Sequence, residues 1–306
     1  DQMDFGKAIS NIRRNKHISI QQITNNTITK SSYNRFVNGE TQPSVNSFLT
    51  LLQNLHVSFE EFLYILRGYK PDYFNEIAMQ IRDATITRNI PLMQEIHATI
   101  STYAQQNPNN QTYLHLKCVT TLILNSLQNE PLDQESKKIL LNYLLKCDVW
   151  THYEHTLFNS VIFIFEPSAV NAMEKRIIRN LDSYELMHIY GNESFRSLCV
   201  ILAFDISHQD LMAAIKVVSK LANFSLHADM LFEKTLYKLF SGIVFLLSGQ
   251  SIGLQNIKEA IQIMQLTDSK DYLKATFAFI KDVCQIYDFH DEGLAQLLKE
   301  GYQKLD

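Results

Sequence analysis

Apolar side chains recur along the chain at the spacing of amphipathic helices, and the first 67 residues predict five short ones. The first covers residues 4–15, and its apolar positions follow the i, i+3, i+4, i+7 pattern: Phe5, Ala8, Ile9 and Ile12. Ser19 is a typical N-cap residue, and it predicts a second helix that buries Ile20 and Ile23.

Local signals also bound the other three helices. The third begins at Thr29 or Lys30 and ends at Asn38-Gly39, a helix-stop signal. The fourth follows Pro43-Ser44 and carries a run of apolar positions: Phe48, Leu51, Leu52 and Leu55. In the fifth, the string "SFEE" predicts a capping box with Ser58 at the N-cap and Glu61 three residues on.

From Tyr73 onward the pattern predicts antiparallel helix pairs. Their first helices start near residues 73, 111, 151, 193, 228 and 269, a period of about 40 residues that is typical of two-helix repeats. Stacked pairs of this kind form a curved, TPR-like solenoid with a concave face. An irregular helical domain is the alternative. We therefore expect an all-α fold: a five-helix domain over residues 1–67, a linker over 68–72 and a helical-repeat domain over 73–306 that binds a ligand and dimerises.

Composition supports helices and argues against a membrane protein. The chain has 306 residues, 46% of them hydrophobic, with only 9 Gly and 6 Pro. Its longest apolar runs are too short to span a bilayer, and its polar start predicts no signal peptide. The four cysteines are widely spaced, form no CxxC pair and lie in apolar helical contexts, so we expect structural free thiols and a cytoplasmic protein.

Charge separates the amino end from the rest of the chain. The net charge is −4, yet the window from Arg13 to Gly39 contains five basic residues and no acidic one. A basic patch on an acidic protein suggests a polyanionic partner, although solvated cations on a small domain are the simpler explanation.

The second and third helices have the spacing of a helix-turn-helix. Tyr33, Phe36 and Val37 would hold the third helix against the core, while its polar side chains face base edges and phosphates. Arginine can read guanine and asparagine can read adenine. The alternative is a surface helix that is merely polar. The predicted contacts to double-stranded DNA are Arg13, Arg14, Lys16, Gln21, Thr29, Lys30, Ser31, Ser32, Asn34 and Arg35.

Residues 18–62 resemble the XRE/Cro-type DNA-binding domain, and more narrowly that of the Rgg family of Gram-positive regulators. The matching positions are Ser19, Ile23, Thr29-Lys30-Ser31, Arg35-Phe36, Gly39-Glu40, Leu51-Leu52, Leu55-His56 and Glu61-Phe62. Looser matches to the same family follow in "WTHYEHTLFNSVIFIF" (150–165) and "FEKTLYKLFSGIVFLLSG". The resemblance implies a homodimeric transcription regulator of the RRNPP group, whose repeat domain binds a short peptide pheromone after import.

One position departs from the family pattern. Many Cro-like domains carry Glu two residues before the glycine of the stop, paired with an arginine of the first helix. Here Val37 takes that place opposite Arg13, so the ion pair is missing, at a cost of only about 0–1 kcal/mol. Our hypothesis is that Arg13 is free for a phosphate. Replacing it with alanine would then weaken DNA binding uniformly and flatten its salt dependence.

Asparagine side chains can clamp a peptide backbone, and aromatic rings supply rigid contact area. The candidate peptide-binding residues are Trp150, Tyr153, Asn159, Tyr190, Asn192, Arg196 and Tyr237. For the aromatic residues, the alternative is core packing, and for the two asparagines it is a turn or cap role. Arg196 could bind a peptide carboxylate, and its alternative is a plain surface position.

Nothing in the sequence predicts catalysis, a metal or a cofactor. "THYEH" (151–155) lacks the HExxH spacing, "DFHDEG" (288–293) lacks the EF-hand pattern, and no GxGxxG, GKS/T or GxSxG string occurs. A peptide-responsive regulator of transcription is thus the leading hypothesis. The alternatives are a DNA-tethered scaffold that binds a protein partner, and a catalytic repeat protein whose activity would survive deletion of residues 1–67.

Overall fold

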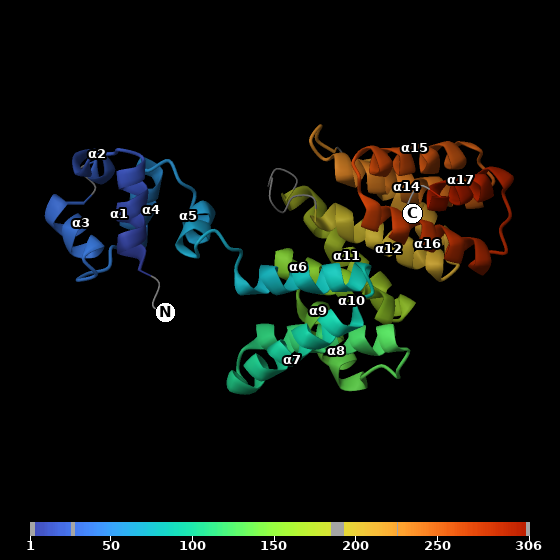
Figure 1. Cartoon of the computed structure of the whole chain (residues 1–306), viewed down its shortest axis with the longest axis horizontal. Helices are drawn as coiled ribbons and strands as arrows, with labels where there is room; N and C mark the ends of the chain where they lie inside the picture. The colour runs from blue at the N-terminus through green and yellow to red at the C-terminus, as the bar shows by residue number, and fades with distance from the viewer. Residues whose placement is uncertain (1–3, 26–27, 185–192, 225, 304–306) are drawn as a thin grey trace. The chain divides into compact units, whose positions relative to one another are not determined.

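The computed structural model describes residues 4–25, 28–184, 193–224 and 226–303, without the side chains of 179–184. These residues form 17 α-helices and one short 3-10 helix, and no strand occurs among them (Figure 1). The all-α prediction is confirmed. The chain divides into two compact units, Asp1–Met79 and Gln80–Asp306.

The first unit contains the five predicted helices. They are α1 (Phe5–Asn15), α2 (Ile20–Thr24), α3 (Lys30–Val37), α4 (Val45–Asn54) and α5 (Phe59–Leu66). Each begins after a side chain that accepts a hydrogen bond from the first helical turn: Asp4, Ser19, Thr29, Ser44 and Ser58. These caps satisfy backbone N–H groups that no helix can satisfy internally, so local sequence sets the helix starts.

The described capping boxes form at α2 and at α10 (His152–Val161), and not at the predicted fifth helix. At α5, the described bond is one half of the box, from the N–H of Glu61 to Ser58 Oγ at 3.0 Å. At α2, both halves form: Gln22 N–H donates to Ser19 Oγ, and Ser19 N–H donates to Gln22 Oε1 at 2.8 Å. The five-residue α2 is too short to be stable alone, so it gains most from the reciprocal pair.

An aromatic cluster centred on Phe48 holds the first unit together. The Phe48 ring lies edge-on to Phe62 at 5.1 Å and to Phe5 and Phe36 at 5.7 and 6.3 Å. Ile9, Ile23 and Leu55 surround this cluster with no exposed surface. All five helices thereby contribute to one core, and α3 is attached to it through Phe36.

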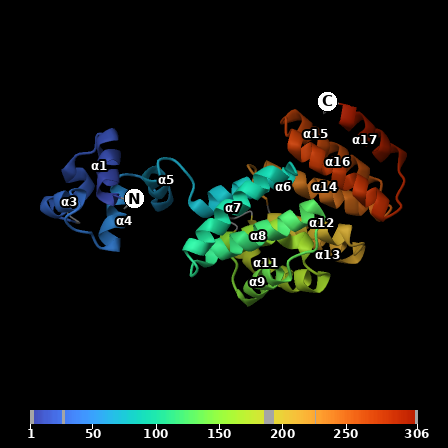
Figure 2. The same ribbon diagram turned by 60° about the horizontal axis from the view of Figure 1, so that its bottom comes forward.

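The second unit is built of helix pairs that follow one another along the chain (Figure 2). The helices are α6 (Tyr73–Ile86), which begins in the first unit, α7 (Ile90–Gln106), α8 (Gln111–Gln128), α9 (Gln134–Lys146), α10 (His152–Val161) with the 3-10 turn η1 (Ile162–Ile164), α11 (Pro167–Tyr184), α12 (Glu193–Ser207), α13 (Leu211–Ala222), α14 (Leu231–Leu247), α15 (Ile252–Leu266), α16 (Lys270–Ile286) and α17 (Glu292–Gln303). The first helices start close to the predicted positions. The largest difference is at α14, which begins at Leu231 rather than near residue 228.

The first helices of successive pairs form an inner row. Helix α10 contacts α8 and α12, and α12 also contacts α14 and α16. Accordingly, α12 is the most buried helix of this unit, with Phe195, Leu198 and Leu202 fully inaccessible. Polar side chains of neighbouring repeats meet along this inner row.

Helices α14 and α15 pack closely against each other through two glycines. A Cβ placed on Gly253 would lie 2.4 Å from both the Gly242 carbonyl oxygen and the Leu246 nitrogen. Both glycines are buried, and they let the two backbones touch without side chains between them. The last repeats are joined by backbone contact as well as by apolar packing.

All four cysteines are free thiols: Cys118 and Cys199 are buried, and Cys147 and Cys284 are half-buried. Burial raises the pKa of each thiol, which keeps it in the unreactive protonated form. Among the described residues, no helix combines the length and the apolar character needed to cross a bilayer.

Candidate functional site

Helix α3 has one buried face and one open face. Tyr33 and Phe36, three residues apart, are each only 2% exposed and anchor the helix to the core. The opposite face presents exposed polar side chains: Lys30, Ser31, Asn34 and Arg35. Tyr33 and Phe36 therefore have the anchoring role predicted for them, and the exposed side chains can reach a partner.

Two residues predicted to contact DNA, Thr29 and Ser32, bond to each other. Thr29 Oγ1 accepts a bond from the Ser32 N–H at 3.1 Å and donates one to Ser32 Oγ at 2.9 Å. The pair caps the amino end of α3, and Ser32 is half-buried. The described contacts of Thr29 and Ser32 stabilise the start of α3, and this role is separate from any contact with a ligand.

Arg13 and Lys16 of the predicted set form hydrogen bonds within the first unit. Arg13 Nε donates to the Tyr33 hydroxyl at 3.1 Å, and its Nη1 donates to the Ile18 carbonyl at 2.7 Å. Lys16 Nζ donates to the carbonyl of Leu55 at 2.9 Å, at the carboxyl end of α4. Arg14 and Gln21 are exposed. Sequence reasoning missed the Arg13–Tyr33 bond, because it sought only a carboxylate partner.

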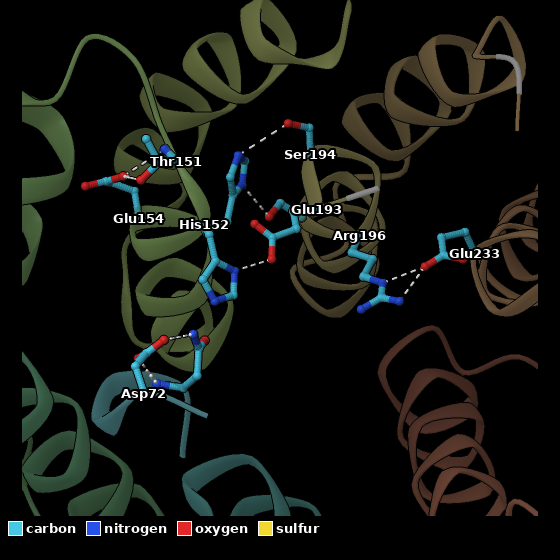
Figure 3. A network of polar contacts seen from close by, with 11 residues as sticks. Asp72, Thr151, His152, Glu154, Glu193, Ser194, Arg196 and Glu233 are labelled. Atoms are coloured by element: carbon cyan, nitrogen blue, oxygen red, sulfur yellow. Dashed lines mark hydrogen bonds and ion pairs between the residues drawn. The ribbon is translucent and has the colours of Figure 1, made fainter. Parts of the chain in front are cut away.

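A polar network joins the inner row of the second unit (Figure 3). His152 Nδ1 of α10 is hydrogen-bonded to the Glu193 carboxylate of α12. One turn further along α10, His155 bonds to Ser197 Oγ at 2.9 Å and to Ser194 Oγ at 3.3 Å. The i, i+3 spacing of the two histidines places both on the face that meets α12. "THYEH" thus carries a packing signal, which could have been read from its spacing.

Arg196 of α12 continues this network to α14. Its Nε and Nη2 both lie 2.6 Å from Glu233 Oε1, and Glu233 is 3% exposed. The guanidinium also lies 5.2 Å from the centre of the Phe232 ring. The charge of Arg196 is already balanced by a buried carboxylate, so a ligand carboxylate would have to compete with Glu233.

Burial decides the protonation of the buried histidines. It lowers the pKa of His155 to about 4 and also lowers the pKa of His115, so both rings are neutral at neutral pH. Burial acts to raise the pKa of Glu154, but hydrogen bonds from Tyr143 and Thr151 outweigh it and hold that pKa below its usual value. The network combines neutral imidazoles with an ionised buried carboxylate.

The structure separates the predicted peptide-binding residues. Trp150 is fully buried and donates through Nε1 to the Leu144 carbonyl at 3.2 Å. Tyr153 bonds through its hydroxyl to His115 Nδ1 at 2.9 Å. The half-buried Tyr237 ring lies 6.4 Å from the Phe195 ring. The structure thus gives these aromatic residues packing partners, which was the alternative interpretation. Tyr190 and Asn192 lie outside the described residues.

Asn159 stands out among these candidates. It lies one turn beyond His155 on α10, and its Oδ1 is buried with no hydrogen-bond partner in the described structure. A buried amide oxygen in this state loses its hydration without compensation, at a cost of about 1–3 kcal/mol. A ligand N–H would satisfy it. Of the predicted residues that the structure describes, Asn159 is the one with a buried polar atom that has no hydrogen-bond partner among the described residues.

A pocket of about 510 Å³ lies elsewhere in the second unit, among α15, α16 and α17. Its lining residues are Gln262, Gln265, Leu266, Asp268, Lys270, Leu273 and Gly301. It contains none of the predicted peptide-binding residues. Polar groups of several repeats converge in the inner-row network, whereas the pocket is lined by the last three helices and the α15–α16 turn alone.

The described residues contain no group of three or more His, Cys, Asp or Glu that could hold a metal ion. The histidines of "THYEH" point into the α10–α12 contact instead, and His290 of "DFHDEG" is 87% exposed.

Comparison with solved structures shows the same fold. A protein described as a transcriptional regulator from Listeria monocytogenes EGD-e matches with a TM-score of 0.80 and 18% identity, over 95% of this chain and 100% of that one. The SHP pheromone receptor Rgg2 of Streptococcus dysgalactiae matches with a TM-score of 0.71 and 18% identity, over 92% and 99%. The structure of the PrgX/iCF10 complex matches with a TM-score of 0.74 and 14% identity, over 100% of this chain and 97% of that one.

The family follows from the sequence itself. Residues 97–278, well over half of the chain, match the model of the C-terminal domain of the HTH-type transcriptional regulator Rgg. Regulators of this family are not enzymes, which agrees with the prediction from the motifs. With the five-helix amino-terminal unit and the helical pairs that follow it, the chain belongs to the Rgg family of HTH-type transcriptional regulators.

Proposed function

We propose that this regulator binds specific DNA sequences as a cytoplasmic homodimer and that a short peptide pheromone on its inner row controls it. Residues 1–67 form the DNA-binding domain, 68–72 the linker, and 73–306 the domain for peptide binding and dimerisation. The unpartnered Oδ1 of Asn159 carries the peptide part of this proposal.

The open face of α3 supports DNA binding. Asn34 and Arg35 are exposed, and they are side chains that read adenine and guanine edges. Lys30 and Ser31 lie beside them at the amino end of α3, where backbone N–H groups and the helix dipole favour phosphate. A single small domain makes few contacts, so two copies on half-sites about one helical turn apart would supply the specificity.

Replacing Arg35 with alanine tests the reading role. Removing one bidentate pair of hydrogen bonds to a base should weaken binding to the preferred duplex about ten- to hundredfold and relax the preference at one base position. Fluorescence anisotropy would measure this on a duplex enriched by the wild type from a random pool. Lys7→Ala is the control, because Lys7 is an exposed cation of α1 whose described ion pair is with Asp4. Equal reductions in both variants would contradict a reading role for Arg35.

Peptide control is supported by the relatives and by Asn159 together. One structural relative is described as a pheromone receptor, and another was solved as complexes named PrgX/iCF10 and PrgX/cCF10. The Asn159 side chain offers a buried acceptor and an amide donor, which is the pairing that a peptide backbone requires.

A thermal-shift screen with short hydrophobic synthetic peptides tests this control. A peptide at 100 times its Kd should stabilise the chain by about 2.7 kcal/mol, in a saturable way. The same peptide should give no shift with Asn159→Leu. If a full-length protein partner saturates the inner row while no peptide does, the chain is a DNA-tethered scaffold instead.

A further inference from the structure

In addition to their apolar packing, one backbone contact and one side-chain hydrogen bond join helix α1 to the reading helix α3. The two α1 residues involved, Gly6 and Arg13, are seven positions apart, so they lie on one face of α1, about 10 Å apart along its axis. Their partners on α3 are Phe36 and Tyr33, which are three positions apart on the buried face of that helix.

The first point is a contact between backbones. A Cβ on Gly6 would lie 2.3 Å from the Phe36 carbonyl oxygen and 2.9 Å from the Val37 Cα. No other residue fits there without moving α3, because real Cβ atoms do not come so close to backbone atoms. Gly6 thereby fixes the distance between α1 and the carboxyl end of α3.

The second point is the Arg13 guanidinium. It bonds to the Tyr33 hydroxyl at 3.1 Å and to the Ile18 carbonyl at 2.7 Å. Ile18 directly precedes Ser19, the N-cap of α2. Arg13 therefore links α1, the start of α2 and the middle of α3. Its bond to Tyr33 takes the place of the arginine–glutamate pair, which cannot form here because Val37 stands at the glutamate position.

We infer that Gly6, Arg13 and Tyr33 are positioning residues that set the angle at which α3 meets DNA. Two separated contacts on one face prevent α3 from pivoting about its apolar anchor, whereas one contact would leave it free to tilt. Tyr33 is 2% exposed, so its hydroxyl acts only through Arg13 and the fold. The inference rests on the proposed sequence-specific DNA binding.

This role makes a different prediction from a direct bond between Arg13 and a phosphate. If Arg13 bound a phosphate, its replacement would lower all DNA affinities alike and flatten the plot of log affinity against log salt concentration. A misaligned α3 forms fewer hydrogen bonds with bases while its exposed cations remain, so the preference falls and the salt slope does not change. One bidentate bond to a base corresponds to about a tenfold preference or more.

The test uses the full chain and two duplexes. The first is enriched by the wild type from a random pool, and the second is a scrambled duplex of the same composition. Affinities are measured for wild type, Arg13→Met and Tyr33→Phe, over a range of salt and at a temperature where each variant is folded. Tyr33→Phe keeps the ring and removes only the hydroxyl, so it remains informative if Arg13→Met does not fold.

We expect the preference for the selected duplex to fall about tenfold or more in both variants, with an unchanged salt slope and scrambled-duplex affinity. The controls Lys7→Gln and Tyr64→Phe, exposed positions of α1 and α5, should keep the preference. The positioning role is overturned if both variants keep the preference, or if their affinities for both duplexes fall equally with a flatter salt slope. Either result leaves the proposed DNA binding intact. A wild type that enriches no sequence would overturn the proposed function and this inference together.

Discussion

Asn159 and Arg13 show what a single residue can reveal only in three dimensions. Both residues were selected from the sequence. The local pattern could not show that Arg13 bonds to Tyr33 or that the Asn159 oxygen is buried without a partner, because burial and contacts between distant residues are not encoded locally. Trp150, Tyr153 and Tyr237 illustrate the same limit: their aromatic character fits a ligand surface and a core equally well. Sequence could name the candidate residues, and the fold separates the unsatisfied Asn159 from those with partners.

Replacing Asn159 with leucine should stabilise the protein without ligand. The change removes a buried acceptor that has no partner and keeps the branched shape of the side chain, so we expect the melting temperature to rise by about 2–4 °C. Differential scanning calorimetry would measure it. Asn125→Leu is the matched control: its Oδ1 accepts the Asp133 N–H at 3.1 Å, so that variant should melt at a lower temperature. A fall for Asn159→Leu would mean that its oxygen is satisfied.

At the scale of elements, helix starts were predictable and helix contacts were not. The starts depend on caps such as Ser19, Thr29, Ser44 and Ser58, whose partners lie within three residues. The pairing of α14 with α15 depends on two glycines eleven positions apart, and only the close approach of the backbones gives them a role. Glycine in a helix interior otherwise signals weakness.

Gly253→Ala tests that close approach through the sign of its effect. In an open helix interior the change would stabilise by about 0.5–1 kcal/mol. Here the new Cβ would meet backbone atoms at 2.4 Å, so we expect the free energy of unfolding to fall by roughly 1–3 kcal/mol or more. Urea unfolding followed by circular dichroism would measure this, with the exposed Gln262→Ala of the same helix as control. Equal stability of the two variants would show that α15 moves away freely.

At the scale of the whole molecule, two buried groups with opposite responses to pH shape its stability. Burial lowers the pKa of His155 to about 4, so the unfolded chain binds the extra proton and stability is lost as pH falls from about 6.5 to about 4. Burial and the carboxylates of Glu174 and Asp210 raise the pKa of Asp205 to about 7, against the nearby Lys220. Its folded form retains a proton, so its contribution falls as pH rises from about 4 to about 7. The two effects oppose each other in the same range.

Asp205→Asn should expose the histidine effect. Above pH 7 the variant should be more stable than the wild type by up to a few kcal/mol, because the penalty for the buried carboxylate is gone. Below pH 4 the two should be alike, and between these limits only the variant should gain stability steeply with pH. Urea titrations from pH 4 to 8 would show it. Parallel curves for the two proteins would mean that Asp205 is ionised in the fold.

The glycines of the close helix contacts also have a genetic consequence. Any single-base change in a glycine codon that replaces glycine with another amino acid introduces a Cβ, because glycine alone lacks one. At Gly6 and Gly253 that atom would collide with the backbone of the neighbouring helix. We therefore expect these two codons to vary only silently among functional descendants of this gene, while the codons of the exposed face of α3 remain open to change.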